Sequence, residues 1–134
     1  MFVDAAAIVA IIGDEAEADR CAAAISAADR RITSPIAVWE AAVALARPEK
    51  TALPVDVTAA MIGEFLLERA IEVKDFPAAD VLVALTTDAA ARFRSGRNRL
   101  NLADCFHYAC ARHYGVPILS TAGEFRFTDL ETVP

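Results

Sequence analysis

Residues 100–121 read LNLADCFHYACARHYGVPILST, and this stretch decides the fold class. Residues 102–114 have apolar side chains at helical spacing, and Gly115 follows where a left-handed C-cap is expected. Residues 116–121 then form a short apolar run typical of a buried strand, with Pro117 near the strand's start, where proline is tolerated. The stretch therefore predicts a helix that leads directly into a buried strand.

The rest of the chain repeats this alternation of longer helices and short strands. Ser34 and Pro35 mark a helix start, because serine caps a helix and proline is tolerated in its first turn. The alternation predicts a parallel sheet covered on both faces, in one domain that spans residues 1–134. The expected strands are residues 2–3, 31–34, 71–73 and 116–121, and the expected helices are residues 5–12, 14–29, 35–47, 56–70, 77–93 and 102–114.

Composition excludes several classes of protein. The chain has 134 residues, 56% of them hydrophobic, and a domain of this length buries roughly two-thirds of its surface without disulfides or structural metals. The three cysteines have no Cys-x-x-Cys spacing, which argues against a disulfide framework and a zinc knuckle. The apolar runs are too short to span a bilayer, and the N-terminal MFVD lacks the basic residue of a secretory signal. We expect a cytoplasmic protein with no membrane partner.

The formal net charge of -6 argues against nonspecific wrapping of nucleic acid, which requires phosphates to be neutralised. A local exception is a set of four arginines within eight residues that contain no acid: Arg92, Arg94, Arg97 and Arg99. They are interpreted either as a solvated helix end, where cations are favourable, or as a surface that positions RNA phosphates. Ser34 and Thr121, near strand ends, are further candidates for contacting phosphate or metal, although capping explains Ser34 equally well.

Four acids stand where ligands of a parallel α/β sheet bind, beyond the carboxyl ends of the strands. Asp4 follows the first strand, and Glu40 is the only charged residue within residues 33–46. Asp104 lies in the first turn of the last helix, and Glu124 follows the last expected strand. Three of the four also have a simpler interpretation: Asp4 and Asp104 are suited to cap helices, and Glu124 is suited to a loop.

Carboxylates that converge in a small site repel one another unless a cation lies between them. Oxygen ligands without cysteine or clustered histidine suit Mg²⁺ or Mn²⁺. Either ion activates water for attack on phosphorus, so the acids predict metal-assisted phosphodiester hydrolysis. Such a mechanism needs no histidine base, and we expect structural roles for His107 and His113 and a core position for Trp39.

Five segments in a fixed order carry a resemblance to a known family: FVDA (residues 2–5), SP leading to EA (34–35 and 40–41), LNLADCFHYA (100–109), PILS (117–120) and FRFTD (125–129). Together they resemble a PIN domain of the VapC toxin type over essentially the whole chain. The resemblance implies a three-layer α/β/α PIN-like fold with a short, mostly parallel central sheet flanked by helices. It also implies a Mg²⁺- or Mn²⁺-dependent endoribonuclease toxin that is neutralised by a VapB-type antitoxin and forms a homodimer.

Under this resemblance, Asp4, Glu40 and Asp104 match the acidic triad of catalytic and metal-binding residues. The fourth acid departs from the pattern, because the family commonly has a Thr-x-Asp aspartate after the last strand, whereas residues 121–125 read TAGEF. Glu124 is the nearest candidate for this fourth catalytic acid. The departure leaves a second metal site, or full activity, open.

Two other functions are considered. A PIN-like module without the fourth aspartate could bind RNA or an antitoxin and cut weakly or not at all. A phosphatase with an aspartyl nucleophile typically needs Asp-x-Asp after the first strand, and the sequence there, Asp4-Ala5-Ala6, lacks the second acid. Asp129 matches a further recurring acid of the family, and we expect it to have a turn or capping role.

Overall fold

Five short parallel strands form the centre of the molecule. The structure is a computed structural model that describes residues 1–133. The strands lie in the order β3-β2-β1-β4-β5, so β1 is central, and Phe2 of β1 is opposite both Ile32 and Ile118. The bounds are β1 (Phe2–Val3), β2 (Ile32–Thr33), β3 (Glu72–Val73), β4 (Ile118–Leu119) and β5 (Thr132–Val133).

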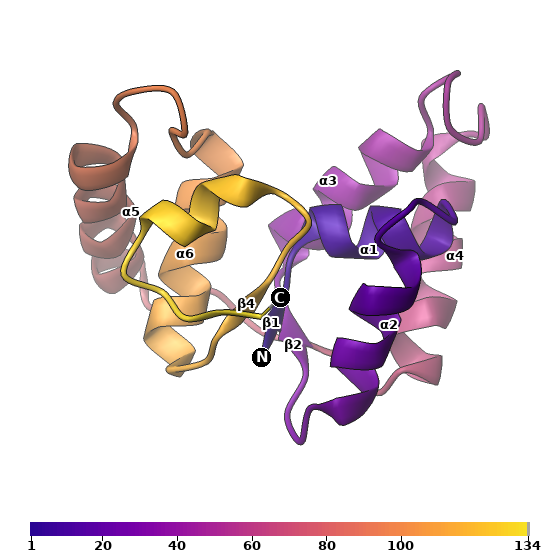
Figure 1. Cartoon of the computed structure of the whole chain (residues 1–134), viewed down its shortest axis with the longest axis horizontal. Helices are drawn as coiled ribbons and strands as arrows, with labels where there is room; N and C mark the ends of the chain where they lie inside the picture. Colours follow the sequence, from indigo (N-terminus) through magenta and orange to yellow (C-terminus); the bar gives the residue numbers. More distant parts are fainter. Residues whose placement is uncertain (134) are drawn as a thin grey trace.

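Helices cover both faces of the sheet (Figure 1). Helices α1 to α4 lie on one side, and α5, α6 and the 3-10 helix η1 lie on the other, which confirms the expected three-layer α/β/α fold. No helix within residues 1–133 is both long enough and apolar enough to cross a bilayer. The helices are α1 (Ala5–Ile12), α2 (Ala18–Ala27), α3 (Pro35–Leu45), α4 (Val55–Glu68), α5 (Ala79–Phe93), α6 (Leu102–Tyr114) and η1 (Gly123–Phe127).

All six expected α-helices are present, but several elements differ from expectation at their ends. Helix α2 begins at Ala18 rather than Asp14, because Asp14 has a φ of 51°, a left-handed conformation that a helix cannot contain. Strand β4 begins at Ile118, after Pro117, which has no backbone N–H to donate. Strand β5 and η1 were not expected, since two residues of strand show no alternation that a sequence pattern could reveal.

The core lies between the sheet and both helical layers. Phe2, Ile32 and Ile118 are fully buried, as expected for parallel strands that are covered on both faces. The expectation that Trp39 lies in this core is wrong, because its side chain is 63% exposed. Helix α3 packs inward through the small residues on its other side, such as Ala37, and Trp39 projects from the opposite side.

Side-chain and glycine caps fix where the helices that border the strands begin and end. Ser34 Oγ accepts a hydrogen bond from the N–H of Ala37 (3.3 Å) and so caps α3. Asn101 and Asp104 form a reciprocal capping box at the start of α6. Gly115 ends α6 with a φ of 61°, as the sequence predicts, and so directs the chain into β4.

Two glycine substitutions test the role of this left-handed cap. Gly115→Ala is expected to lower the free energy of unfolding by about 1 kcal/mol, because an alanine Cβ is strained at positive φ. Gly63→Ala is the matched control, since Gly63 lies inside α4 with open space around its Cβ position, and it is expected to raise the free energy of unfolding by about 0.5–1 kcal/mol. Urea unfolding measures both changes, and equal effects of the two substitutions would contradict the assignment.

Candidate active site

The carboxyl ends of three neighbouring strands meet at one edge of the sheet, and the candidate acids gather there. Asp4 follows β1, Ser34 follows β2 and Ser120 follows β4. The N–H of Asp4 donates to the carbonyl of Leu119 (3.0 Å), which holds β1 and β4 together at this edge. Asp4 and Ser120, separated by 116 positions in the sequence, are thereby brought into contact.

Asp4 is buried, and both of its carboxylate oxygens have specific neighbours. Ser120 Oγ donates a hydrogen bond to Asp4 Oδ2 (2.6 Å), and His107 Nδ1 lies 2.5 Å from Asp4 Oδ1. Asp4 stands at the N-cap position of α1, but these contacts direct its carboxylate toward β4 and α6. Burial opposes the charged form, yet the contacts with His107 and Ser120 outweigh it and hold the pKa of Asp4 below its ordinary value.

His107 lies between two of the candidate acids, which the sequence interpretation did not anticipate. Its ring is fully buried, with Nδ1 against Asp4 and Nε2 3.4 Å from Glu40 Oε2. Burial opposes the charged imidazole, but Asp4, with smaller contributions from Glu40 and Asp104, raises the pKa of His107. The signal was present in the sequence, because positions three apart share a helix face and His107 follows Asp104 by three residues.

Glu40 reaches the same region from α3. About a third of its side chain is exposed, so it is the most accessible acid of the expected triad. Burial raises the pKa of Glu40; the nearby charges of Asp4 and Asp104 raise it further, while His107 lowers it. These couplings place Glu40 within electrostatic range of both other acids.

Asp104 has two roles. It caps α6, as one interpretation of the sequence predicted, and its carboxylate also interacts with the other acids. Its Oδ2 accepts a hydrogen bond from the N–H of Asn101 (2.6 Å), and its own N–H donates to Asn101 Oδ1 (3.0 Å). Burial raises the pKa of Asp104, the bond from Asn101 opposes that rise, and the charges of Asp4 and Glu124 add to it. Glu124, at the start of η1, is therefore close enough to act on Asp104.

Comparison with known proteins identifies the family. The model of the PIN domain matches residues 1–130. The VapC ribonuclease Mb0640 of Mycobacterium bovis is 33% identical over 142 aligned residues, which cover 99% of this chain and 98% of the relative. The VapC ribonuclease R02377 of Rhizobium meliloti is 32% identical, with 96% of this chain and 98% of the relative covered. The chain belongs to the PIN domain family.

The fold of this PIN domain is also found in a solved structure. The crystal structure of Mycobacterium tuberculosis VapC20, described as a Sarcin-Ricin loop cleaving toxin, has a TM-score of 0.76 and covers 98% of this chain and 97% of its own. At 17% identity this likeness supports the fold alone. Together with the relatives named VapC ribonuclease, it confirms the resemblance inferred from the sequence.

The donor set of this PIN domain fits a divalent cation. Within residues 1–133 no three His, Cys, Asp or Glu side chains are already spaced as a metal site. Asp4 Oδ1 is nevertheless buried, and no group among residues 1–133 donates a properly oriented hydrogen bond to it. Buried, mutually repelling carboxylates with an unsatisfied oxygen favour a bound cation.

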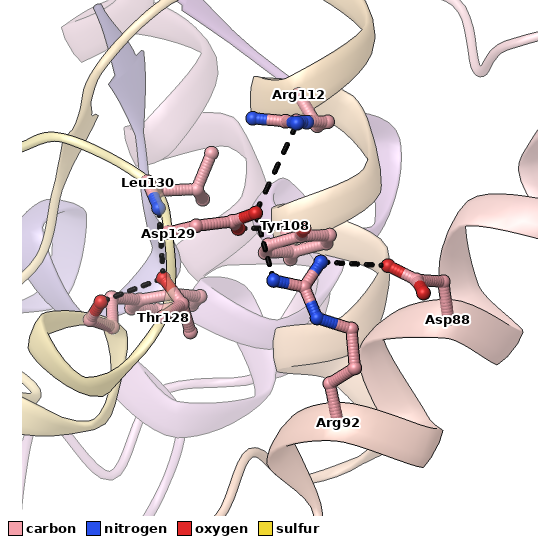
Figure 2. A network of polar contacts seen from close by, with 8 residues as sticks. Asp88, Arg92, Tyr108, Arg112, Thr128, Asp129 and Leu130 are labelled. Carbon is pink, nitrogen blue, oxygen red and sulfur yellow. Dashed lines mark hydrogen bonds and ion pairs between the residues drawn. The ribbon is translucent and has the colours of Figure 1, made fainter.

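The four arginines of the basic segment have different surroundings. Arg92 donates to Asp88 (3.0 Å) and to Asp129 (2.9 Å), and Tyr108 also donates to Asp129 (2.8 Å), as Figure 2 shows. Asp129 thus ties the segment before β5 to α5 and α6. The other three arginines of this segment are exposed and form no ion pair within residues 1–133: Arg94, Arg97 and Arg99.

A cavity of about 310 Å³ between α1 and α3 borders the acidic site. Glu40 and Thr121 line it, and so do Arg47 and Lys50 from the loop that follows α3. Ser34, in contrast, is fully buried and engaged in capping α3. A second cavity, of about 260 Å³, lies at the opposite edge of the sheet and contains none of the four candidate acids.

The pairing of His107 with Asp4 predicts a measurable pH dependence. Because the pKa of His107 is raised in the folded protein, protonation of its ring stabilises the fold. This contribution is fully present below the unfolded pKa of about 6.5 and is lost as the pH rises through the folded pKa. Urea unfolding in EDTA is expected to show a stability difference between wild type and His107→Gln that shrinks as pH rises.

Ring NMR provides a direct check on the same pairing. The His113→Gln background leaves His107 as the single histidine, so its ring signals are unambiguous. Asp4→Asn in that background is expected to lower the pKa of His107, because the substitution removes the negative charge that most stabilises the protonated ring. An unchanged titration curve would contradict the pairing.

Proposed function

We propose that this chain is a divalent-metal-dependent endoribonuclease that acts as the toxin of a toxin–antitoxin system. The observation that carries the proposal is the cluster of Asp4, Glu40 and Asp104 at the carboxyl edge of the sheet of a PIN domain. Full-length relatives named VapC ribonuclease support RNA as the substrate. The reaction is hydrolysis of a phosphodiester bond.

Asp4, Glu40 and Asp104 would hold the metal, either Mg²⁺ or Mn²⁺, since both ions accept carboxylate oxygens. When bound, the ion supplies an activated water and stabilises charge on the leaving oxygen. Two of the three carboxylates are already oriented by the protein, Asp4 by Ser120 and Asp104 by Asn101. Glu124 is the fourth acid of the proposal, and its charge acts on Asp104 from the start of η1.

The exposed arginines next to this site would bind the RNA backbone. Arg94, Arg97 and Arg99 precede α6, whose first turn carries Asp104, and no acid lies among them. Arginine forks match phosphate oxygens and position an RNA without reading its sequence. Thr121, on the cavity that Glu40 also lines, would be a further contact with the substrate.

The proposed protein partners are a VapB-type antitoxin and a second copy of the chain. The proposed location of all three is the cytoplasm. Exposed apolar side chains on α3 and α4, among them Trp39 and Leu67, offer a surface for an amphipathic segment of the antitoxin. The names of the relatives are consistent with such a partner.

Replacing the acids tests the nuclease directly. Asp4→Asn and Asp104→Asn are each expected to reduce RNA cleavage at least about 100-fold, because each removes a charge that would hold the ion. EDTA is expected to abolish cleavage by wild type. The matched control is Asp80→Asn, an exposed acid in the first turn of α5, which should cleave normally.

Circular dichroism would establish that each variant is folded. Wild-type cleavage by the folded double variant Asp4→Asn, Asp104→Asn would refute the proposal. Binding of RNA or antitoxin without cleavage, in the presence of either metal, would favour the alternative of a catalytically weak binding module. The observation that favours this alternative is the departure at the fourth acid, because residues 121–125 read TAGEF where the family commonly has a Thr-x-Asp aspartate.

The basic segment gives a separate prediction. The triple variant Arg94→Ala, Arg97→Ala, Arg99→Ala is expected to weaken RNA binding and to reduce the slope of log K against log salt by about 2, since each lost single-strand phosphate contact removes about 0.7. Arg92→Ala is the matched control, because Asp88 and Asp129 already hold this guanidinium, and it should leave the slope unchanged. Fluorescence anisotropy over a salt series measures both, and equal slopes for wild type and the triple variant would contradict the assignment.

A further inference from the structure

The cavity between α1 and α3 has more lining residues than the proposed nuclease site uses. Its volume of about 310 Å³ is at the lower end of the range for pockets that hold small organic ligands. Glu40 lines this cavity and is also one of the three acids of the proposed metal site. A ligand in the cavity would therefore lie beside the reacting centre.

Four charged residues line the cavity, and three of them already have a partner or a role. Lys50 forms an ion pair with Glu15, so these two charges compensate each other. Glu40 belongs to the acidic cluster. Arg47 is exposed and forms no ion pair within residues 1–133. Of the two cations on the cavity, Arg47 is therefore the one available to bind an anion.

Arg47 stands on a turn that hydrogen bonds hold in place. Its carbonyl accepts hydrogen bonds from the N–H groups of Lys50 (2.9 Å) and Ala52 (3.2 Å). The N–H of Thr51 donates to the carbonyl of Leu45 at the end of α3 (3.1 Å). Because these bonds already order the backbone, a ligand has to fix only the side chain of Arg47, which lowers the entropic cost of binding.

Part of the cavity wall is apolar and consists of small side chains. Ala5, Ala6 and Val9 contribute to it from α1, and Ala44 contributes from α3. Short side chains leave room for a flat ring to lie against the helices, and such a contact removes apolar surface from water. None of the four side chains donates or accepts a hydrogen bond, so this wall suits a nucleobase without selecting its identity.

Arg47 also lies within electrostatic range of the acids. Burial raises the pKa of Glu40, and the charge of Arg47 is among the influences that lower it. A guanidinium binds phosphate oxygens through two parallel hydrogen bonds. The combination of an available cation with an apolar wall favours a nucleotide over a segment of a protein partner, since each nucleotide carries both a negative phosphate and a flat ring.

We propose that the cavity between α1 and α3 is a subsite for one nucleotide of the RNA, next to the cleaved bond, and that Arg47 binds the phosphate of this nucleotide. The inference rests on the proposed function and adds a substrate contact from the layer of α1 to α4. Figure 1 shows the turn after α3 and the segment between α5 and α6, which carries Arg94, Arg97 and Arg99, on opposite sides of the sheet. An RNA strand that contacts both must pass from one helical layer to the other.

Fluorescence anisotropy of a short single-stranded RNA of mixed sequence, bound to the full chain in EDTA, tests the phosphate contact. Arg47→Ala is expected to weaken binding at least about ten-fold and to reduce the slope of log K against log salt by about 0.7, because one charge-assisted contact is lost. Arg47→Lys should restore the slope, since it keeps the charge. The matched control is Arg30→Ala, an exposed arginine before β2 that does not line the cavity, and it should match wild type.

A second variant and a measurement on wild type test whether the cavity itself is occupied. Ala44→Leu keeps every charge and fills part of the cavity, so it is expected to weaken RNA binding at least about three-fold with an unchanged salt slope. Amide NMR of wild type needs no substitution, and addition of the same RNA should move the signals of Ala6 and Val9.

Wild type that binds no RNA, an unchanged salt slope for Arg47→Ala, or cavity signals that RNA does not move would each overturn the inference. The nuclease would still stand, since its cleavage is measured separately with Mg²⁺ or Mn²⁺. RNA that is bound through Arg47 and cut with neither ion would support the inference and count against the nuclease. Cavity signals that a protein partner moves and RNA does not would assign the cavity to that partner and also overturn the inference.

Discussion

A carboxylate removed from water must be compensated, and the contacts that compensate part of the charge of Asp4 join three separate parts of the chain. Asp4 follows the central strand β1. Ser120, which donates to it, follows β4, and His107, which lies against it, is on α6. These contacts hold the edge of the sheet against the helix that also carries Asp104. The geometry of the whole acidic cluster depends on this one buried side chain.

The charged groups near the start of α6 and those further along the helix differ in how completely they are paired. At the start of the helix, acids outnumber their partners, and the raised pKa values of Glu40 and Asp104 reflect burial and mutual repulsion. Further along the helix, Tyr108 and Arg92 satisfy Asp129, so that acid belongs to a closed network. An incompletely compensated cluster is a candidate for binding and chemistry, whereas a closed network stabilises the fold.

Much of the fold and part of the site could be predicted from the sequence. The helices have apolar faces that repeat over several turns, and Asp4, Glu40 and Asp104 stand out as acids in apolar surroundings or at strand and helix ends. Strand β5 is too short for a pattern, and the bond between Arg92 and Asp129 joins residues 37 positions apart. Trp39 was misjudged because an apolar residue on an alanine-rich helix does not reveal which side faces the core. The contacts of His107 could not be predicted, because its partners Asp4 and Glu40 come from distant parts of the chain, after β1 and within α3.

Asp104 and Asp4 are oriented by partners at very different distances along the chain. Asp104 is held by Asn101, three residues away, so its orientation is established as soon as the first turn of α6 forms. Asp4 acquires Ser120 only after the chain has been synthesised through position 120, because the two residues are 116 positions apart. A growing chain on the ribosome therefore lacks the contact between Asp4 and Ser120 until the segment that carries Ser120 has emerged.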